Sequence, residues 1–304
     1  MGFDYRGVHV PLVTPFNADF SVDEKGYRTL CRHYLDKVKA QGLVPCGTTG
    51  ESPTLTGEEK RRLIQIAVEE AGGKVPVMAG TGTNSTASTI EMTCAAEKLG
   101  ADACLVVGPY YNKPTPEGML AHFKAVAAST SLPIFIYNIP GRTGKNIDPK
   151  TVIELAEVEN IVGLKDAAGD LNQTMQIISG TRGIKKADGA PFYVLSGEDS
   201  LTYSIMALGG HGTIAATAHV VGEELVEMMA CFRKGDLVGA REIQYRILPM
   251  LKALFIESNP SPLKAVLPMM GLPAGTVRLP LVDVQPASRD ALRKAMADLG
   301  KIRG

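Results

Sequence analysis

Eight short apolar runs recur between residues 8 and 216, separated by segments with helical periodicity. The runs are rich in Val, Ile and Leu, and none alternates polar with apolar positions. That pattern is typical of strands covered on both faces. The runs lie at 8–13, 43–46, 75–79, 103–107, 133–137, 161–165, 192–196 and 212–216. They predict eight buried, parallel strands.

The segments between the runs carry helix start and stop signals. Thr56 followed by Glu59 resembles a capping box, and the next four apolar positions share one helix face. Those positions are Leu63, Ile64, Ala67 and Val68. Glycine ends several helical patterns, as at Gly100 and Gly209. Eight strands alternating with helices predict an α/β fold, a (β/α)8 TIM barrel, rather than an open doubly wound sheet.

The pattern changes after residue 221, where only helical periodicity remains. Helices are expected at 222–234, 236–256, 260–270 and 287–300. We therefore divide the chain into a (β/α)8 catalytic barrel, residues 1–221, and a C-terminal α-helical domain, residues 222–304. Prolines at 260 and 262 punctuate this extension, and no low-complexity linker is present.

Composition narrows the function classes. The 304 residues carry 32 basic and 32 acidic side chains, so no nucleic-acid or anionic-membrane partner is expected. No apolar run approaches the roughly 20 residues of a membrane span, and the start lacks a signal-peptide pattern, which predicts a cytoplasmic protein. The five cysteines and five histidines show no metal-binding spacing. We expect neither a metal nor a cofactor.

The loops that follow the strands hold the candidate chemistry, because a barrel of this type has its site at the C-terminal strand ends. The second strand leads into a turn with two hydroxyls, Thr48 and Thr49, that could bind a carboxylate. An ordinary loop is the alternative interpretation. The loop 80–85 lacks the third glycine and acidic partner of a dinucleotide fingerprint. A phenol, Tyr137, ends the fifth strand, and Arg142 follows as a potential carboxylate clamp.

Lys165 ends the apolar run of the sixth strand. A lysine at a strand end usually extends to water along its apolar stem. If it points into a cavity instead, desolvation lowers its pKa and the neutral amine can form a Schiff base with a carbonyl. An amine, phenols, threonine hydroxyls and an arginine on one rim suit imine chemistry on a small carboxylated carbonyl compound.

These residues occur in motifs that resemble the dihydrodipicolinate synthase family. The motifs run in order along nearly the whole chain. They are Gly47-Thr48-Thr49-Gly50-Glu51, Tyr110-Tyr111-Asn112, Tyr137 to Gly144, Gly163-Leu164-Lys165-Asp166, Leu195 to Asp199, Gly209 to Gly212 and Ser258 to Lys264. The resemblance implies a lyase of the class I aldolase type that condenses pyruvate with L-aspartate 4-semialdehyde. That reaction is the first committed step of diaminopimelate and lysine biosynthesis.

The resemblance also implies a role for each motif residue. Lys165 would form the imine with pyruvate, Tyr137 would donate and accept protons, and Thr48 would connect Tyr137 to Tyr111 in a proton relay. Substrate-binding roles fall on Thr49 for the pyruvate carboxylate, Arg142 for the semialdehyde carboxylate, the Ile214 backbone, and Gly197.

In the family the residue matching Tyr111 enters from a neighbouring subunit, which implies a homo-oligomer, either a dimer or a dimer-of-dimers tetramer. Many relatives are also inhibited by lysine at this interface. Ser52, Asn84 and Tyr110 fit that allosteric site, whereas Gly57, Lys60 and Ser88 depart from it. The site loses a carboxylate at Ser88 and gains a cation at Lys60, so we expect weak or absent lysine inhibition.

Two alternatives remain open from the sequence. One keeps the Schiff base with another substrate, as in a 2-keto-3-deoxy sugar-acid aldolase or dehydratase, an N-acetylneuraminate lyase, or a hydroxyproline-pathway deaminase. Thr49 and Arg142 favour the synthase, because the neuraminate lyases commonly have serine and the sugar-acid aldolases usually lack the arginine. The other alternative is a non-catalytic pyruvate-binding barrel, against which the retention of Lys165, Tyr137, Thr48 and Tyr111 argues.

Overall fold

The computed structural model describes residues 2–302 and contains one sheet of eight strands. The strands are β1 (Gly7–Pro11), β2 (Gly42–Val44), β3 (Met78–Gly80), β4 (Ala103–Val107), β5 (Ile134–Asn138), β6 (Ile161–Asp166), β7 (Tyr193–Ser196) and β8 (Gly212–Ile214). Their order is β2-β1-β8-β7-β6-β5-β4-β3, and every neighbouring pair is parallel. An isolated parallel bridge between Leu43 and Val77 brings the two ends of this order together. The predicted (β/α)8 barrel is therefore confirmed.

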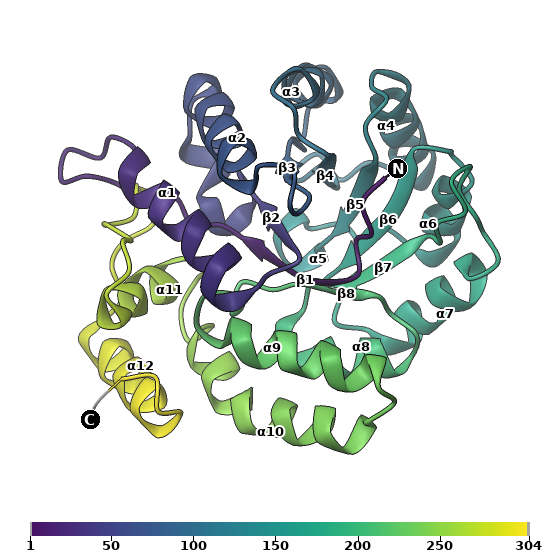
Figure 1. Ribbon diagram of the computed structural model, residues 1–304. Coiled ribbons are helices and arrows are strands. Elements are labelled where there is room, and N and C mark those ends of the chain that lie inside the picture. The colour runs from purple at the N-terminus through teal and green to yellow at the C-terminus, as the bar shows by residue number, and fades with distance from the viewer. Residues whose placement is uncertain (1, 303–304) are drawn as a thin grey trace.

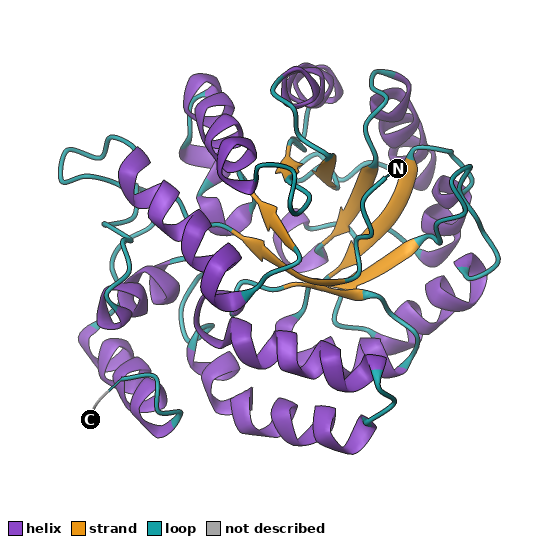
Figure 2. Ribbon diagram, in the orientation of Figure 1, coloured by secondary structure: helices purple, strands orange, loops and turns teal. Residues whose placement is uncertain are grey.

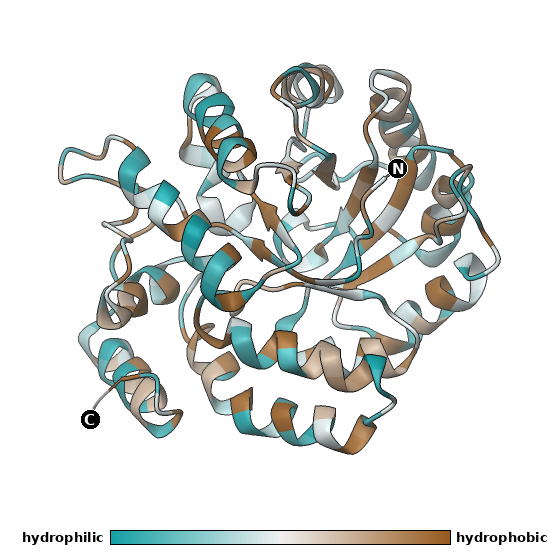
Figure 3. Ribbon diagram, viewed as in Figure 1, coloured by the Kyte–Doolittle hydropathy of each residue, from teal (hydrophilic) through white to brown (hydrophobic). Residues whose placement is uncertain are grey.

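Helices surround the strands, as Figures 1 and 2 show. Those of the barrel are α1 (Glu24–His33), α2 (Gly57–Ala71), α3 (Thr86–Lys98), α4 (Pro116–Ala128), α5 (Pro140–Thr143), α6 (Pro149–Ala156), α7 (Leu171–Thr181) and α8 (Thr202–Ala207). The capping box predicted from Thr56 and Glu59 is present at the start of α2. Hydrophobic residues of these helices face the strands and polar residues face outward (Figure 3).

The C-terminal helices are α9 (Ala218–Arg233), α10 (Leu237–Ala253), α11 (Ser261–Val266) and α12 (Pro286–Asp298). Helix α10 packs against α9, and α12 contacts both α10 and α11. The sequence placed the first of these helices at residue 222, but α9 begins at Ala218. The proposed boundary between residues 221 and 222 thus falls inside α9, at the non-helical backbone of Val221. The division into two domains stays a prediction.

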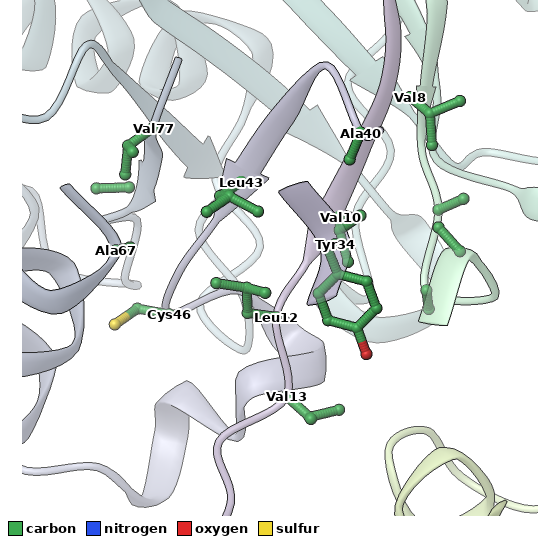
Figure 4. Packing of buried hydrophobic residues seen from close by; sticks show 14 of the residues in the cluster. Val8, Val10, Leu12, Val13, Tyr34, Ala40, Leu43, Cys46, Ala67 and Val77 are labelled. Carbon is green, nitrogen blue, oxygen red and sulfur yellow. The ribbon is translucent and has the colours of Figure 1, made fainter. Parts of the chain in front are cut away.

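The core has two layers. The larger layer lies between the strands and the helices, and Figure 4 shows part of it, with Leu12, Leu43 and Tyr34 packed together. The smaller layer fills the barrel with side chains that alternate with those of the outer layer. On β5, Phe135 and Tyr137 point inward while Ile134 and Ile136 point outward. This alternation decides which strand residues reach the barrel interior.

The N-terminal segment closes one end of the barrel. Tyr5 packs its ring 5.0 Å from Phe135 and 5.6 Å from Tyr193, and its hydroxyl donates to the Asp102 carbonyl at 3.0 Å. Burial raises the pKa of the Tyr5 phenol, which keeps it a neutral donor. The Tyr5 ring therefore packs against interior residues of β5 and β7.

Among residues 2–302, no helix combines the length and the apolar character that a membrane crossing requires. The same residues form no group of three or more His, Cys, Asp or Glu side chains that could hold a metal ion.

Candidate active site

Lys165 lies inside the barrel, near the C-terminal end of β6. Its neighbour Leu164 belongs to the outer layer, so strand alternation turns Lys165 inward, where only 7% of its surface is exposed. Its stem passes over Gly197, where a Cβ atom would lie 2.8 Å from the lysine Cγ. Gly197 therefore leaves the space that the lysine side chain occupies. The alternative in which Lys165 extends to water is wrong.

Tyr137 lies beside Lys165 on the neighbouring strand. The two residues are direct partners in the β5–β6 ladder, and the Lys165 Nζ lies 4.2 Å from the centre of the Tyr137 ring. Tyr137 is itself buried in the barrel interior. The amine and the phenol are thus held by two rigid strands rather than by loops.

The two threonines occupy a single 3-10 turn, Thr48–Gly50, that follows β2. Gly50 closes the turn against β1, because a Cβ there would lie 2.9 Å from the Leu12 carbonyl oxygen. Thr49 is buried, and its Oγ1 accepts a hydrogen bond from the Asn259 side-chain amide at 3.0 Å. Thr48 lines the cavity that contains Lys165.

Arg142 is carried by α5, a single turn that begins at Pro140 directly after β5. Its terminal Nη2 donates to the backbone carbonyl of Asn259 at 3.4 Å. Asn259 therefore contacts both Thr49 and Arg142, while its side-chain Oδ1 is buried without a partner among the described residues. Asn259 had no predicted role, although it lies in the motif Ser258 to Lys264.

Two cavities open at this end of the barrel. The lysine cavity, of about 250 Å³, contains the Lys165 side chain. Its walls include seven of the eight predicted catalytic and substrate-binding residues, namely Lys165, Tyr137, Thr48, Thr49, Arg142, Gly197 and Ile214. The tyrosine cavity, of about 280 Å³, adjoins it and shares Thr48, Tyr137, Ile139 and Arg142. A basic clamp, an amine, a phenol and hydroxyls thus surround one small space.

Tyr111 is the eighth residue and lies apart from the lysine cavity. Its side chain is 89% exposed, and its backbone is left-handed, with φ of 72°. The Tyr111 N–H donates to the Thr143 carbonyl at 3.3 Å, which connects the segment Tyr110-Tyr111-Asn112 to the end of α5. Within one chain, then, the Tyr111 side chain does not join the other seven.

The residues predicted for the allosteric site are divided between two places. Ser52 and Tyr110 line the tyrosine cavity, together with the non-matching Lys60. Asn84 lies in the loop between β3 and α3, where its carbonyl accepts a hydrogen bond from the Asn112 side chain at 2.8 Å. Ser88 is exposed on α3.

Asp199 is an acidic group in the lysine cavity that the sequence analysis did not single out. Its side chain is buried, and Oδ2 accepts the Thr217 N–H at 2.7 Å, at the start of α9. Burial raises the pKa of Asp199 to about 6, and the nearby charge of Lys165 partly opposes that rise. Asp199 could have been identified in the sequence from its position in the motif Leu195 to Asp199.

Known proteins share this sequence and fold over almost their full length. The family model described as "Dihydrodipicolinate synthetase family" matches residues 4–299. A 4-hydroxy-tetrahydrodipicolinate synthase from Moorella thermoacetica is 48% identical, with 95% of this chain and 96% of that protein aligned. The protein of the same name from Desulforudis audaxviator is 43% identical, with 96% and 97% aligned.

Solved structures of dihydrodipicolinate synthases have the same fold as this chain. A crystal structure of dihydrodipicolinate synthase from Thermotoga maritima superposes with a TM-score of 0.94 at 39% identity, covering 98% of this chain and 99% of the other. A second crystal structure of a dihydrodipicolinate synthase gives a TM-score of 0.91 at 44% identity, covering 98% and 100%.

Proposed function

The chain belongs to the dihydrodipicolinate synthetase family, and we propose that it condenses pyruvate with aspartate 4-semialdehyde through an imine at Lys165. The activity is that of a 4-hydroxy-tetrahydrodipicolinate synthase, a lyase of diaminopimelate and lysine biosynthesis, as in the relatives at 42–48% identity. These relatives favour the synthase over a sugar-acid aldolase, a neuraminate lyase or a deaminase.

One observation carries the proposal: a buried lysine shares a cavity of about 250 Å³ with a phenol and an arginine. The cavity is small, which limits the water that can compete with a substrate for contact with the amine. The arginine supplies a planar donor pair for a carboxylate. Both substrates carry a carboxylate and a carbonyl, which this set of groups matches.

In the first half-reaction, the Lys165 amine attacks C2 of pyruvate. Loss of the carbonyl oxygen as water leaves a protonated imine, and Tyr137 passes the protons that this exchange requires. Thr49 and the adjacent backbone hold the pyruvate carboxylate, while Gly197 and the Ile214 backbone face the substrate. Removal of a methyl proton then converts the imine to an enamine.

In the second half-reaction, the enamine carbon attacks the aldehyde of the semialdehyde, whose carboxylate Arg142 binds. The aldehyde oxygen takes up a proton and becomes the hydroxyl of the product. The amino group of the semialdehyde next displaces Lys165 from the imine carbon, which closes the ring and regenerates the free lysine. No metal or organic cofactor takes part in this sequence.

We propose further that the site is completed by a second copy of the chain. Tyr111 is exposed and does not line its own lysine cavity, so a partner subunit could receive it and continue the relay from Tyr137 and Thr48. A homodimer, or a tetramer of two such dimers, would provide this arrangement. We place the enzyme in the cytoplasm with its small-molecule substrates.

The test of the proposed function has two stages. Borohydride reduction in the presence of pyruvate is expected to add one stable adduct, which peptide mapping should locate at Lys165. Lys165→Met is the matched control, and it should give no adduct. Turnover of aspartate semialdehyde, coupled to a reductase that consumes the product, should then be detected. An adduct without that turnover would reject the synthase, and no adduct would reject the imine.

A further inference from the structure

A buried ion pair joins the C-terminal extension to the turn that carries the two threonines. The Lys264 Nζ lies 2.7 Å from the Glu51 Oε1, and the two side chains are 3% and 1% exposed. Lys264 belongs to α11, while Glu51 directly follows Thr48–Gly50. Charges this deeply buried are tolerated only when their hydrogen bonds are fully satisfied.

Each member of this pair has further partners that fix its position. The Lys264 Nζ also donates to the backbone carbonyls of Thr14, at 2.8 Å, and Thr276. The second carboxylate oxygen of Glu51 accepts the Arg278 N–H at 2.9 Å. Burial lowers the pKa of Lys264, and the charge of Glu51 opposes that fall. The geometry is therefore determined on both sides of the ion pair.

Lys264 also contacts the turn indirectly, through Thr14. The Thr14 hydroxyl donates to the Gly50 carbonyl at 2.7 Å, so Lys264 holds both Glu51 and the residue that holds Gly50. Glu51 itself has a left-handed backbone, with φ of 56°, which its buried side chain keeps in place. The turn is thus fixed at its C-terminal end by residues from both ends of the chain.

We propose that Glu51 and Lys264 are positioning residues, which hold the Thr48–Gly50 turn so that Thr49 and its backbone can receive the pyruvate carboxylate. This inference rests on the proposed function. Stability alone is a poor explanation for the pair, because well-packed apolar residues often replace a buried ion pair with no loss of stability. The C-terminal extension is then a part of the substrate site.

The network continues through Arg278 to the next helix. Arg278 pairs with Glu59, the capping residue of α2, and its guanidinium lies 4.2 Å from the Phe16 ring. Lys264 lies at the same distance over that ring. A shift of the Thr48–Gly50 turn would therefore have to break contacts with three parts of the protein at once: the loop after β1, helix α2 and the C-terminal extension.

The decisive variant replaces both charges at once, Glu51→Met with Lys264→Met, which preserves volume and leaves no unpaired buried charge. We expect it to fold with a lowered midpoint of thermal unfolding, because the Thr14 and Thr276 carbonyls and the Arg278 N–H lose their partners. The KM for pyruvate should rise about tenfold or more, because a misplaced binding group can reduce rates by up to 10²-fold. At saturating pyruvate, borohydride should still trap the imine at Lys165 in full.

Lys186→Met is the matched control. Lys186 is also buried, but its amine donates to the carbonyls of Ala156 and Val158 after α6, away from both cavities. This variant should lose stability and keep the natural KM for pyruvate. If Glu51 and Lys264 only stabilised the fold, the double variant and Lys186→Met would both keep the natural KM for pyruvate. The pyruvate KM therefore distinguishes a positioning role from a purely stabilising one.

If the double variant does not fold, Glu51→Gln decides the question. It keeps one oxygen acceptor and the side-chain shape, and it should raise the pyruvate KM by a smaller factor. A natural KM for pyruvate in whichever of these variants folds would overturn the proposal. Failure of the proposed function is distinguishable, because it would show in the natural protein as no imine or no turnover.

Discussion

Tyr137 and Lys165 are partners across the β5–β6 ladder, and the lysine amine lies 4.2 Å from the centre of the tyrosine ring. Their relative position is set by strand register, which a loop movement cannot alter. The amine lies over the face of the tyrosine ring, inside the barrel. The relative position of the amine and the tyrosine ring is therefore determined by the sheet.

Tyr137→Phe tests the proton-transfer role of the hydroxyl. The ring stays in place over the amine, so the fold and the burial of Lys165 should be retained. Loss of a general acid–base group should lower kcat by about 10²- to 10⁴-fold. Steady-state turnover measures this effect, and borohydride trapping should show slower imine formation. A kcat equal to that of the natural protein would show that another group moves the protons.

Arg142→Ala should separate the two half-reactions. Arg142 is proposed to bind the semialdehyde carboxylate, and hydrogen bonds to charged groups contribute about 1.5–3 kcal/mol. The KM for semialdehyde should therefore rise about 10- to 100-fold, while imine formation with pyruvate changes little. Arg142→Lys should recover only part of the loss, because an ammonium cannot make the two parallel hydrogen bonds. Equal damage to both steps would reject the assigned role.

The sequence predicted the barrel and most of its site because both follow from local pattern. Each apolar run forms a strand, and the residues that follow the strands meet at one rim of the barrel. Lys165, Tyr137 and Thr48 could therefore be predicted as neighbours from their places at strand ends. Asn259 and Asp199 were missed because their roles depend on distant partners. Asn259 reaches Thr49 across 210 positions, and no spacing rule predicts that contact.

The observed boundaries of β3 and α9 differ from the predicted ones, and at both places a distant aspartate side chain accepts a backbone N–H. The strand expected at 75–79 begins at Met78, because the Val77 N–H donates to the Asp102 carboxylate at 2.9 Å and residue 76 is a proline. Helix α9 begins at Ala218 rather than 222, and its backbone is non-helical at Val221, so a short first turn precedes the predicted start; the Asp199 carboxylate accepts the Thr217 N–H in front of that turn. Both partners lie too far along the chain to be predicted from local sequence.

Lysine inhibition is expected to be weak. Lys60 lines the tyrosine cavity with Ser52 and Tyr110, and Ser88 is the position where the family resemblance implies an acidic residue in lysine-sensitive enzymes. Ser88→Glu should restore part of the missing attraction, lowering the inhibitory lysine concentration about fivefold, which corresponds to one exposed ion pair. Ser88→Gln controls for size. Strong inhibition of the natural protein at sub-millimolar lysine would contradict this prediction.

Asp199 should make the stability of the protein depend on pH in a defined direction. Burial raises its folded-state pKa from 3.8 to about 6. Below the lower value the carboxyl is protonated in both states, and between the two values only the unfolded state releases the proton. Ionisation therefore favours unfolding, so the contribution of this group to stability falls as pH rises through that window. It then stays constant above the folded pKa.

Asp199→Asn isolates this effect, because the amide oxygen can still accept the Thr217 N–H while the charge is removed. The two proteins should differ little in pH-dependent stability below the lower pKa. Above the folded pKa the variant should be more stable by up to about 3 kcal/mol, the amount that a shift of about two pKa units represents. Urea unfolding at matched protein concentration measures the difference at each pH. Parallel pH profiles for the two proteins would show that Asp199 ionises in the folded state as readily as in water, and that its proximity to Lys165 offsets its burial.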